Sequence, residues 1–143
     1  MIEQTTQTET ELARLPVTCI QDVLLARMIV RQESARMGFP PQLVTQIATA
    51  TSEITRNVVE HSGGVGQARI LEVAEPLRRG LKIAVQDTGS GIPDVKRVLA
   101  GTSPGAGIPG CRRVMDEFGI TSESRRGTTV TMLKWLPLVP RQS

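Results

Sequence analysis

Apolar residues recur every three or four positions in two long segments of the chain, and this spacing predicts two helices. The first begins at Asp22, which we expect to cap it, and ends at Gly38 with Pro40 beyond. The second begins at Pro41 and continues to His61, where the sequence SGGVG ends it. A third, shorter helix is expected to open at Pro109 and Gly110, to include CRRVMDEF and to stop at Gly119.

Other segments alternate apolar and polar residues, which predicts strands. Residues 68–74 (ARILEVA) and 81–86 (LKIAVQ) are separated by EPLRRG and suit an antiparallel hairpin. Residues 15–20 are a candidate edge strand, and residues 120–124 and 128–136 are two further strands. The resulting order predicts an α+β fold: a two-layer sandwich with a mixed, mostly antiparallel sheet and helices on one face.

Composition indicates one domain, which we place at residues 15–137. Residues 1–14 are rich in Thr, Gln and Glu and predict a disordered tail, and residues 138–143 form a short C-terminal tail. A net charge of +3 and 2% aromatic residues argue against a nucleic-acid partner. No apolar run is long enough for a membrane span, and Cys19 and Cys111 belong to no metal or disulfide pattern, so we expect a cytoplasmic protein without a membrane partner.

Glu53 and Asn57 lie four residues apart in the second predicted helix, so they project from nearly the same side. A carboxylate and an amide oxygen placed in this way can hold a hard divalent cation such as Mg²⁺, or a water, against a ligand. The alternative is that both belong to the solvated side of an amphipathic helix.

The segment Asp87-Thr88-Gly89-Ser90-Gly91 directly follows a predicted strand. Its glycines let the backbone approach a flat ligand, and the carboxylate of Asp87 can accept a hydrogen bond from an exocyclic amine such as that of adenine. The alternative is a turn in which Asp87 bonds its own backbone.

The loop from Gly105 to Gly110 (GAGIPG) matches GxGxxG but follows no strand and has no acidic residue at the expected distance, so a dinucleotide fingerprint is disfavoured. A glycine-rich loop entering a helix still offers N–H groups to phosphates. Arg112 and Arg113, expected in the first turn of that helix, either reach phosphates or face solvent.

Four segments in this order, SEITRNVVEH, DTGSGIPD, GAGIPG and GTTV, resemble the successive boxes of the GHKL (Bergerat-fold) ATPase superfamily. Over about residues 16–136 the chain is most similar to the small serine/threonine kinases of bacterial partner-switching systems, those of the stressosome in particular. The resemblance implies ATP and Mg²⁺ as cofactors. It also implies an active site built by residues of all four boxes.

The resemblance assigns each box a role. Glu53 would be the general base and Asn57 the Mg²⁺ ligand. Asp87 would bind the adenine amine, with Gly89 and Gly91 shaping the pocket and Thr128 beside the base. The lid backbone would wrap the triphosphate, through Gly105, Ala106, Gly107, Ile108 and Gly110.

The implied activity is phosphoryl transfer to a Ser or Thr of a STAS-domain antagonist or scaffold protein, after which the freed kinase binds a downstream phosphatase or similar regulator. The lid between Asp94 and Gly110 lacks an Arg just before its GAG, where the related anti-sigma kinases carry one, and this argues against sigma-factor binding. The shortness of the lid still leaves an alternative open. In that alternative the chain is an anti-sigma factor or a non-catalytic, nucleotide-dependent binding module.

Overall fold

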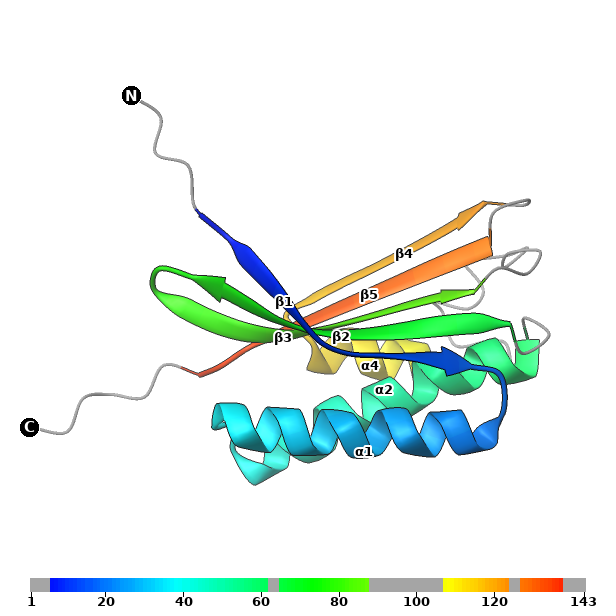
Figure 1. Cartoon of the computed structure of the whole chain (residues 1–143), viewed down its shortest axis with the longest axis horizontal. Helices are drawn as coiled ribbons and strands as arrows, with labels where there is room; N and C mark the ends of the chain where they lie inside the picture. The colour runs from blue at the N-terminus through cyan, green and yellow to red at the C-terminus, as the bar shows by residue number, and fades with distance from the viewer. Residues whose placement is uncertain (1–5, 62–64, 88–106, 124–126, 138–143) are drawn as a thin grey trace, which may run out of the picture.

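The computed structural model describes residues 6–61, 65–87, 107–123 and 127–137, which form a sheet layer and a helix layer (Figure 1). Five strands make one antiparallel sheet in the order β1-β2-β3-β5-β4, and the helices cover one of its faces. The elements are β1 (Thr8–Val17), α1 (Ile20–Met37), α2 (Pro41–His61), β2 (Gly66–Glu75), β3 (Arg78–Asp87), α4 (Gly107–Val114), β4 (Glu117–Glu123) and β5 (Gly127–Trp135). The predicted α+β sandwich is confirmed.

The core lies between the sheet and the helices. On β3 the residues Leu81, Ile83 and Val85 are buried at every second position, while Ile47 and Ile54 of α2 are buried opposite the sheet. Burial of each such side chain contributes about 1.5–3 kcal/mol, which fixes α2 against the middle strands. The predicted hairpin of β2 and β3 is confirmed, with longer strands and Pro76 and Leu77 alone between them.

Both long helices lie where the sequence predicts them. The end of α1 is confirmed at Gly38, whose φ of 99° is left-handed and suits glycine. The predicted cap at Asp22 is wrong: Cys19 is the N-cap residue, and Asp22 lies inside the first turn. From there its carboxylate accepts hydrogen bonds from the Thr18 backbone N–H at 2.9 Å and hydroxyl at 2.8 Å.

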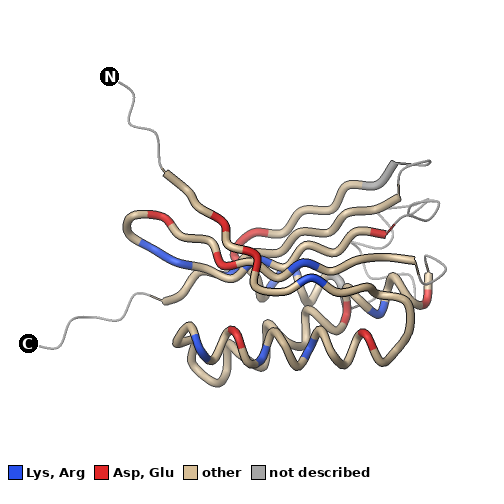
Figure 2. The backbone as a smooth tube through the Cα atoms, viewed as in Figure 1, with Lys and Arg blue, Asp and Glu red and all other residues tan. Residues whose placement is uncertain are grey.

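The disordered tail predicted for residues 1–14 is wrong from Thr8 onward, because β1 begins there and pairs with β2. Ion pairs replace apolar burial along this half of the strand. Glu9 meets the Lys82 ammonium at 2.7 Å, and Glu11 meets the Arg69 guanidinium at 2.7 Å. Acidic positions of β1 thus lie close to basic positions of neighbouring strands (Figure 2).

The third helix is shorter than predicted and starts earlier. It runs from Gly107 to Val114, and Gly119 lies inside β4 instead of ending the helix. The Asp116 backbone N–H donates to the Leu133 carbonyl at 2.9 Å, and its carboxylate accepts from the Trp135 N–H at 2.7 Å. This pairing with β5 satisfies backbone groups that a longer helix would have used.

Candidate nucleotide site

Glu53 and Asn57 lie one turn apart on helix α2, and both are partly exposed. Neighbouring polar residues of α2 are buried but satisfied within the helix. The Thr51 hydroxyl donates to the Ile47 carbonyl at 2.9 Å, and the Thr55 hydroxyl donates to the Thr51 carbonyl at 2.7 Å. The side chains of α2 that remain accessible to a ligand therefore include the predicted carboxylate of Glu53 and the predicted amide of Asn57.

The Glu53 carboxylate forms an ion pair with the Arg56 guanidinium at 3.2 Å. The Glu53 side chain is 31% exposed and that of Arg56 is 39% exposed, so solvent screens the pair. Arg56 is not among the residues assigned to the site from the sequence. The i,i+3 spacing was the signal that could have identified this contact.

Asp87 is the last residue of β3 and is only 3% exposed. The Thr128 backbone N–H, on β5, donates to Asp87 Oδ1 at 3.3 Å. Thr128 is also buried, and β3 pairs with β5 along its length. The sheet thus brings together two predicted site residues that are 41 positions apart.

Two glycines make room around Asp87. Gly127 has a φ of 88°, and a Cβ there would lie 2.0 Å from the Asp87 carbonyl oxygen. A Cβ at Gly66, the pairing partner of Asp87, would lie 2.6 Å from Cγ1 of Val58. Because Val58 follows Asn57 directly, the C-terminal half of α2 packs at the end of β3 beside Asp87. From the sequence, Gly66 is placed only in the segment that ends the second helix, and its close contact follows from its position as the first residue of β2.

Helix α4 packs against the middle of α2. The Cys111 thiol lies 3.6 Å from the Ala50 carbonyl oxygen and is buried. Burial, together with the nearby negative charge of Glu53, raises the pKa of the Cys111 thiol to about 12. The helix that follows the glycine-rich loop is therefore held beside Glu53.

The structure places only part of the predicted glycine-rich segments. Gly107 and Ile108 are in the first turn of α4, and a Cβ added at Gly110 would meet no atom of the described residues within 4 Å apart from the backbone of its own helix. Arg112 and Arg113 are exposed in the last turn of this short helix, and their predicted position in its first turn is wrong. The remaining predicted site residues, Gly89, Gly91, Gly105 and Ala106, lie outside the described residues.

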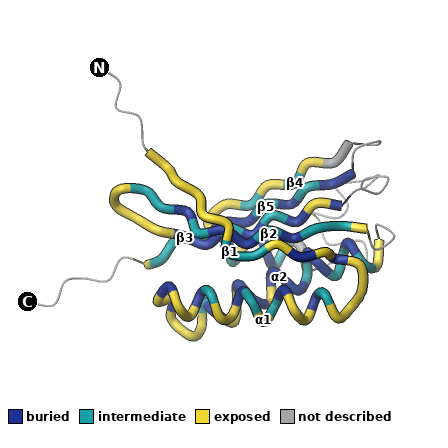
Figure 3. The backbone as a smooth tube through the Cα atoms, in the orientation of Figure 1, coloured by how far each residue is buried: buried dark blue, intermediate teal, exposed yellow. Residues whose placement is uncertain are grey.

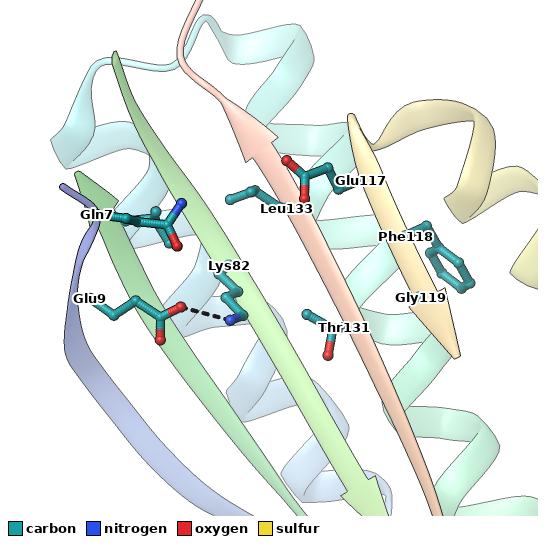
Figure 4. A pocket seen from close by; sticks show the side chains of 9 residues that line it. Gln7, Glu9, Lys82, Glu117, Phe118, Gly119, Thr131 and Leu133 are labelled. Atoms are coloured by element: carbon teal, nitrogen blue, oxygen red, sulfur yellow. Dashed lines mark hydrogen bonds and ion pairs between the residues drawn. The ribbon is translucent and has the colours of Figure 1, made fainter. Parts of the chain in front are cut away.

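A hollow of about 300 Å³ lies on the opposite side of the sheet, on the face without helices (Figure 4). Lys82, Thr131 and Leu133 line it, and Glu9 reaches Lys82 across it. None of the predicted site residues contributes to its lining. We therefore place the candidate site at the end of β3, next to α2 and α4, and not in this hollow.

The donor set at Asn57 fits Mg²⁺ in one specific way. Within the described part of the chain, no three His, Cys, Asp or Glu side chains gather into a metal cage. Mg²⁺ commonly keeps several waters and takes one or two protein oxygens together with substrate phosphates. An amide oxygen at Asn57, with Glu53 one turn away, suits that mode of binding.

Comparison with known proteins finds one family model and several related sequences. The family model described as "Histidine kinase-like ATPase domain" matches residues 16–134. The serine/threonine-protein kinase RsbT of Bacillus subtilis is 40% identical over 120 residues, which cover 80% of this chain and 90% of RsbT. The anti-sigma F factor of Clostridium novyi is 29% identical over 125 residues, covering 81% and 87%, and that of Geobacillus stearothermophilus is 30% identical over 118 residues, covering 76% and 81%.

The histidine kinase domain of the blue-light activated histidine kinase from Erythrobacter litoralis EL346 has a similar fold. Its TM-score is 0.53 at 18% identity, and the match covers 87% of this chain and 62% of that one. At this identity the likeness supports the fold alone. In the described residues, no helix has the length and apolar character to cross a membrane.

Proposed function

The chain belongs to the histidine kinase-like ATPase domain family, and we propose that it acts there as the kinase of a partner-switching system. The resemblance to GHKL ATPases noted in the sequence is confirmed, and relatedness to RsbT identifies a protein serine/threonine kinase. ATP is accordingly the phosphoryl donor. The observation that carries the proposal is that α2 packs against both the Asp87 end of β3 and α4.

In this proposal, the substrate is a STAS-domain antagonist or scaffold protein in the cytoplasm. Phosphorylation of its Ser or Thr releases the kinase, which then binds a downstream phosphatase or similar regulator. Similarity to proteins named as a kinase and as anti-sigma factors supports a role that combines phosphoryl transfer with protein binding.

The proposed roles follow the placement of the residues. Asp87, held by the Thr128 N–H, would accept a hydrogen bond from the adenine amine, and Thr128 would lie beside the base. Asn57 would hold Mg²⁺, and the bound ion would neutralise negative charge on the phosphates. Backbone N–H groups of the lid would hold the phosphates, with Gly89 and Gly91 shaping the base pocket; the lid residues are Gly105, Ala106, Gly107, Ile108 and Gly110.

Glu53 would act as the general base. Its carboxylate would accept the proton of the attacking Ser or Thr hydroxyl while the hydroxyl oxygen forms the new bond to the γ-phosphorus of ATP and the bond from that phosphorus to the departing oxygen of ADP breaks. To do so it must exchange its contact with Arg56 for one with the hydroxyl. An exposed ion pair contributes about 0–1 kcal/mol, so this exchange costs little.

Transfer of labelled phosphate from ATP to a purified STAS-domain protein tests the proposal. Glu53→Gln keeps the shape of the side chain and should abolish transfer while ATP binding survives. The matched control is Glu60→Gln, which removes an exposed carboxylate from the same helix and should leave transfer unchanged. Unchanged transfer in Glu53→Gln would refute the assignment of the base.

The second candidate function is an anti-sigma factor or a non-catalytic, nucleotide-dependent binding module. The similarity to two anti-sigma F factors favours it. Stable complex formation with a sigma factor, without phosphate transfer to any STAS-domain protein, would support this function over the first.

A further inference from the structure

Lys134 lies on the face of β5 that is turned toward the helices. Val130 and Met132 of β5 belong to the core, and Lys134 follows them at the next position of the same period of two. Thr131 and Leu133 face the other way and line the hollow. The Lys134 side chain is only 16% exposed, and Figure 3 shows β5 as buried or half-buried along its length. An ammonium placed in a row of core residues requires polar partners nearby.

The ammonium of Lys134 binds the C-terminal end of α4. It donates to the carbonyl oxygen of Val114, the last residue of α4, at 2.9 Å, and it pairs with Asp116 Oδ1 at 3.4 Å. The last carbonyl groups of a helix have no partner within the helix and carry the negative end of its dipole, so a cation is favourable there. Lys134 thus caps α4 from a strand of the sheet.

Asp116 completes this contact on the side of β5. Its Oδ2 accepts the Trp135 backbone N–H at 2.7 Å, and its own backbone N–H donates to the Leu133 carbonyl at 2.9 Å. Met115 and Asp116 alone separate α4 from β4. The carbonyl of Val114 and the side chains of Lys134 and Asp116 therefore fasten one end of α4 to β5, and we call this unit the Lys134 clip.

The clip acts on the opposite end of α4 through the helix itself. With eight residues, α4 is about 12 Å long, so an ammonium held at its C-terminal end cannot reach a group bound at its first residue, Gly107. In the middle of α4, the Cys111 thiol lies 3.6 Å from the Ala50 carbonyl oxygen of α2. Release of the clip would let α4 tilt about this contact, and the N–H groups of its first turn would move.

We propose that Lys134 is a positioning residue for the nucleotide. By clamping the C-terminal end of α4, it holds the N–H groups of Gly107 and Ile108 where they meet the phosphates. This inference rests on the proposed function, because that function assigns the phosphates to these N–H groups. It adds to that function a residue that lies outside all four boxes of the sequence and touches neither the nucleotide nor Mg²⁺.

Affinities for Mg-ATP and for adenosine, each measured with the intact chain by competition with a fluorescent ATP analogue, test this role. Adenosine has the base but no phosphates, so its affinity should not depend on the position of the first turn of α4. Lys134→Met keeps most of the side-chain length without the charge. It should weaken Mg-ATP at least about tenfold, because hydrogen bonds to phosphate weaken steeply as the donors move, and should leave adenosine unchanged. Lys134→Arg retains a cation and its donors and should bind both as the parent chain does.

A second variant and a matched control make the test independent of Lys134→Met alone. Asp116→Asn can still accept the Trp135 N–H but loses the ion pair with Lys134, so it should also weaken Mg-ATP, and its effect should not add fully to that of Lys134→Met. The control is Lys82→Met, which removes the same charge from β3, where Lys82 pairs with Glu9 at 2.7 Å on the face without helices (Figure 4). It should leave both affinities unchanged, and thermal melts verify that each variant is folded.

The outcomes separate a failure of this inference from a failure of the proposed function. Equal affinity of the parent chain for Mg-ATP and adenosine would overturn both, since the phosphates would then make no contact of consequence. If the parent prefers Mg-ATP and Lys134→Met prefers it to the same degree, this inference alone is wrong. Equal weakening of both ligands in Lys134→Met would also overturn it, as would a loss of Mg-ATP affinity in Lys82→Met as large as that in Lys134→Met.

Discussion

At Gly127, the absence of a Cβ allows Asp87 to occupy the end of β3. Substitution by Ala would combine a left-handed φ with a contact of 2.0 Å to the Asp87 carbonyl oxygen. We expect Gly127→Ala to lower the free energy of unfolding by at least about 2 kcal/mol, since the strained φ alone costs about 1–3 kcal/mol. Urea unfolding followed by circular dichroism measures the change.

Gly110 is the matched control for Gly127. Gly110 lies in α4, and beyond the backbone of that helix a Cβ there meets no atom within 4 Å in the part of the chain that the structure describes. Gly110→Ala should therefore stabilise the chain slightly, by up to about 1 kcal/mol. Equal losses of stability in both variants would refute crowding near Asp87 as the cause of the loss in Gly127→Ala.

The two cysteines should differ strongly in reactivity. Cys19 is exposed, whereas Cys111 is buried, with a pKa raised to about 12 by burial and by the charge of Glu53. Only the thiolate attacks disulfide reagents, so at pH 8 we expect Cys19 to react quickly and Cys111 to react only after unfolding. Titration with an aromatic disulfide reagent measures the reaction rates of both thiols, and Cys19→Ser is the control. Rapid reaction of Cys111 in the folded Cys19→Ser variant would contradict the packing of α4 on α2.

The sequence predicted site residues whose chemistry is carried by residue type and local spacing. Glu53 and Asn57 follow from a helix period, and Asp87 follows from its place at a strand end. The contact of Thr128 with Asp87 and the crowding at Gly66 depend on which strands become neighbours, which local spacing does not encode. The roles of these residues stay a prediction.

Among the elements, the long helices were predictable because apolar residues recur at helical spacing in both and a clear terminator follows each. The boundary of α4 was not, since the helical spacing of CRRVMDEF continues into residues that pair with β5. The first half of β1 was missed for a related reason. In the sequence its glutamates are indistinguishable from solvated polar residues. Only the assembled sheet brings Lys82 and Arg69 within ion-pair distance of them.

The pairing of β1 predicts an acid sensitivity centred on Glu11. Hydrogen bonds from Arg14 and Arg69 hold the pKa of Glu11 below its usual value of 4.5. A lowered pKa means that the folded state binds the proton less readily than the unfolded state, so the contribution of Glu11 to stability is complete above pH 4.5 and is lost as the pH falls through the lowered value.

Comparison of Glu11→Gln with the parent chain measures this contribution. The parent should be the more stable of the two in urea at pH 7, and the difference should disappear in strong acid. Glu60→Gln, at the exposed end of α2, is the control for a general loss of negative charge. A difference between parent and Glu11→Gln that does not change with pH would exclude the ion pairs as its source.

At the scale of the whole molecule, α2 contacts both the Asp87 end of β3 and α4. Because this central helix belongs to the candidate site, nucleotide binding should increase the stability of the whole fold. A ligand that binds only the folded state at 100 times its Kd stabilises it by about 2.7 kcal/mol. We expect Mg-ATP to raise the Tm of the parent chain and of the control Leu77→Gln alike, because Leu77 is 89% exposed in the turn between β2 and β3 and belongs to no predicted nucleotide residue.

Asp87→Asn should behave differently from both chains. Its amide oxygen can still accept the Thr128 N–H, so the fold should survive, but the group that would accept the adenine amine is no longer a carboxylate. We expect its Tm to change little on addition of Mg-ATP, with Mg-GTP as the control ligand for purine selectivity. If Mg-ATP raises the Tm of Asp87→Asn as much as that of the parent chain, Asp87 does not contribute to nucleotide binding. That result would not affect the observed packing of α2 against β3.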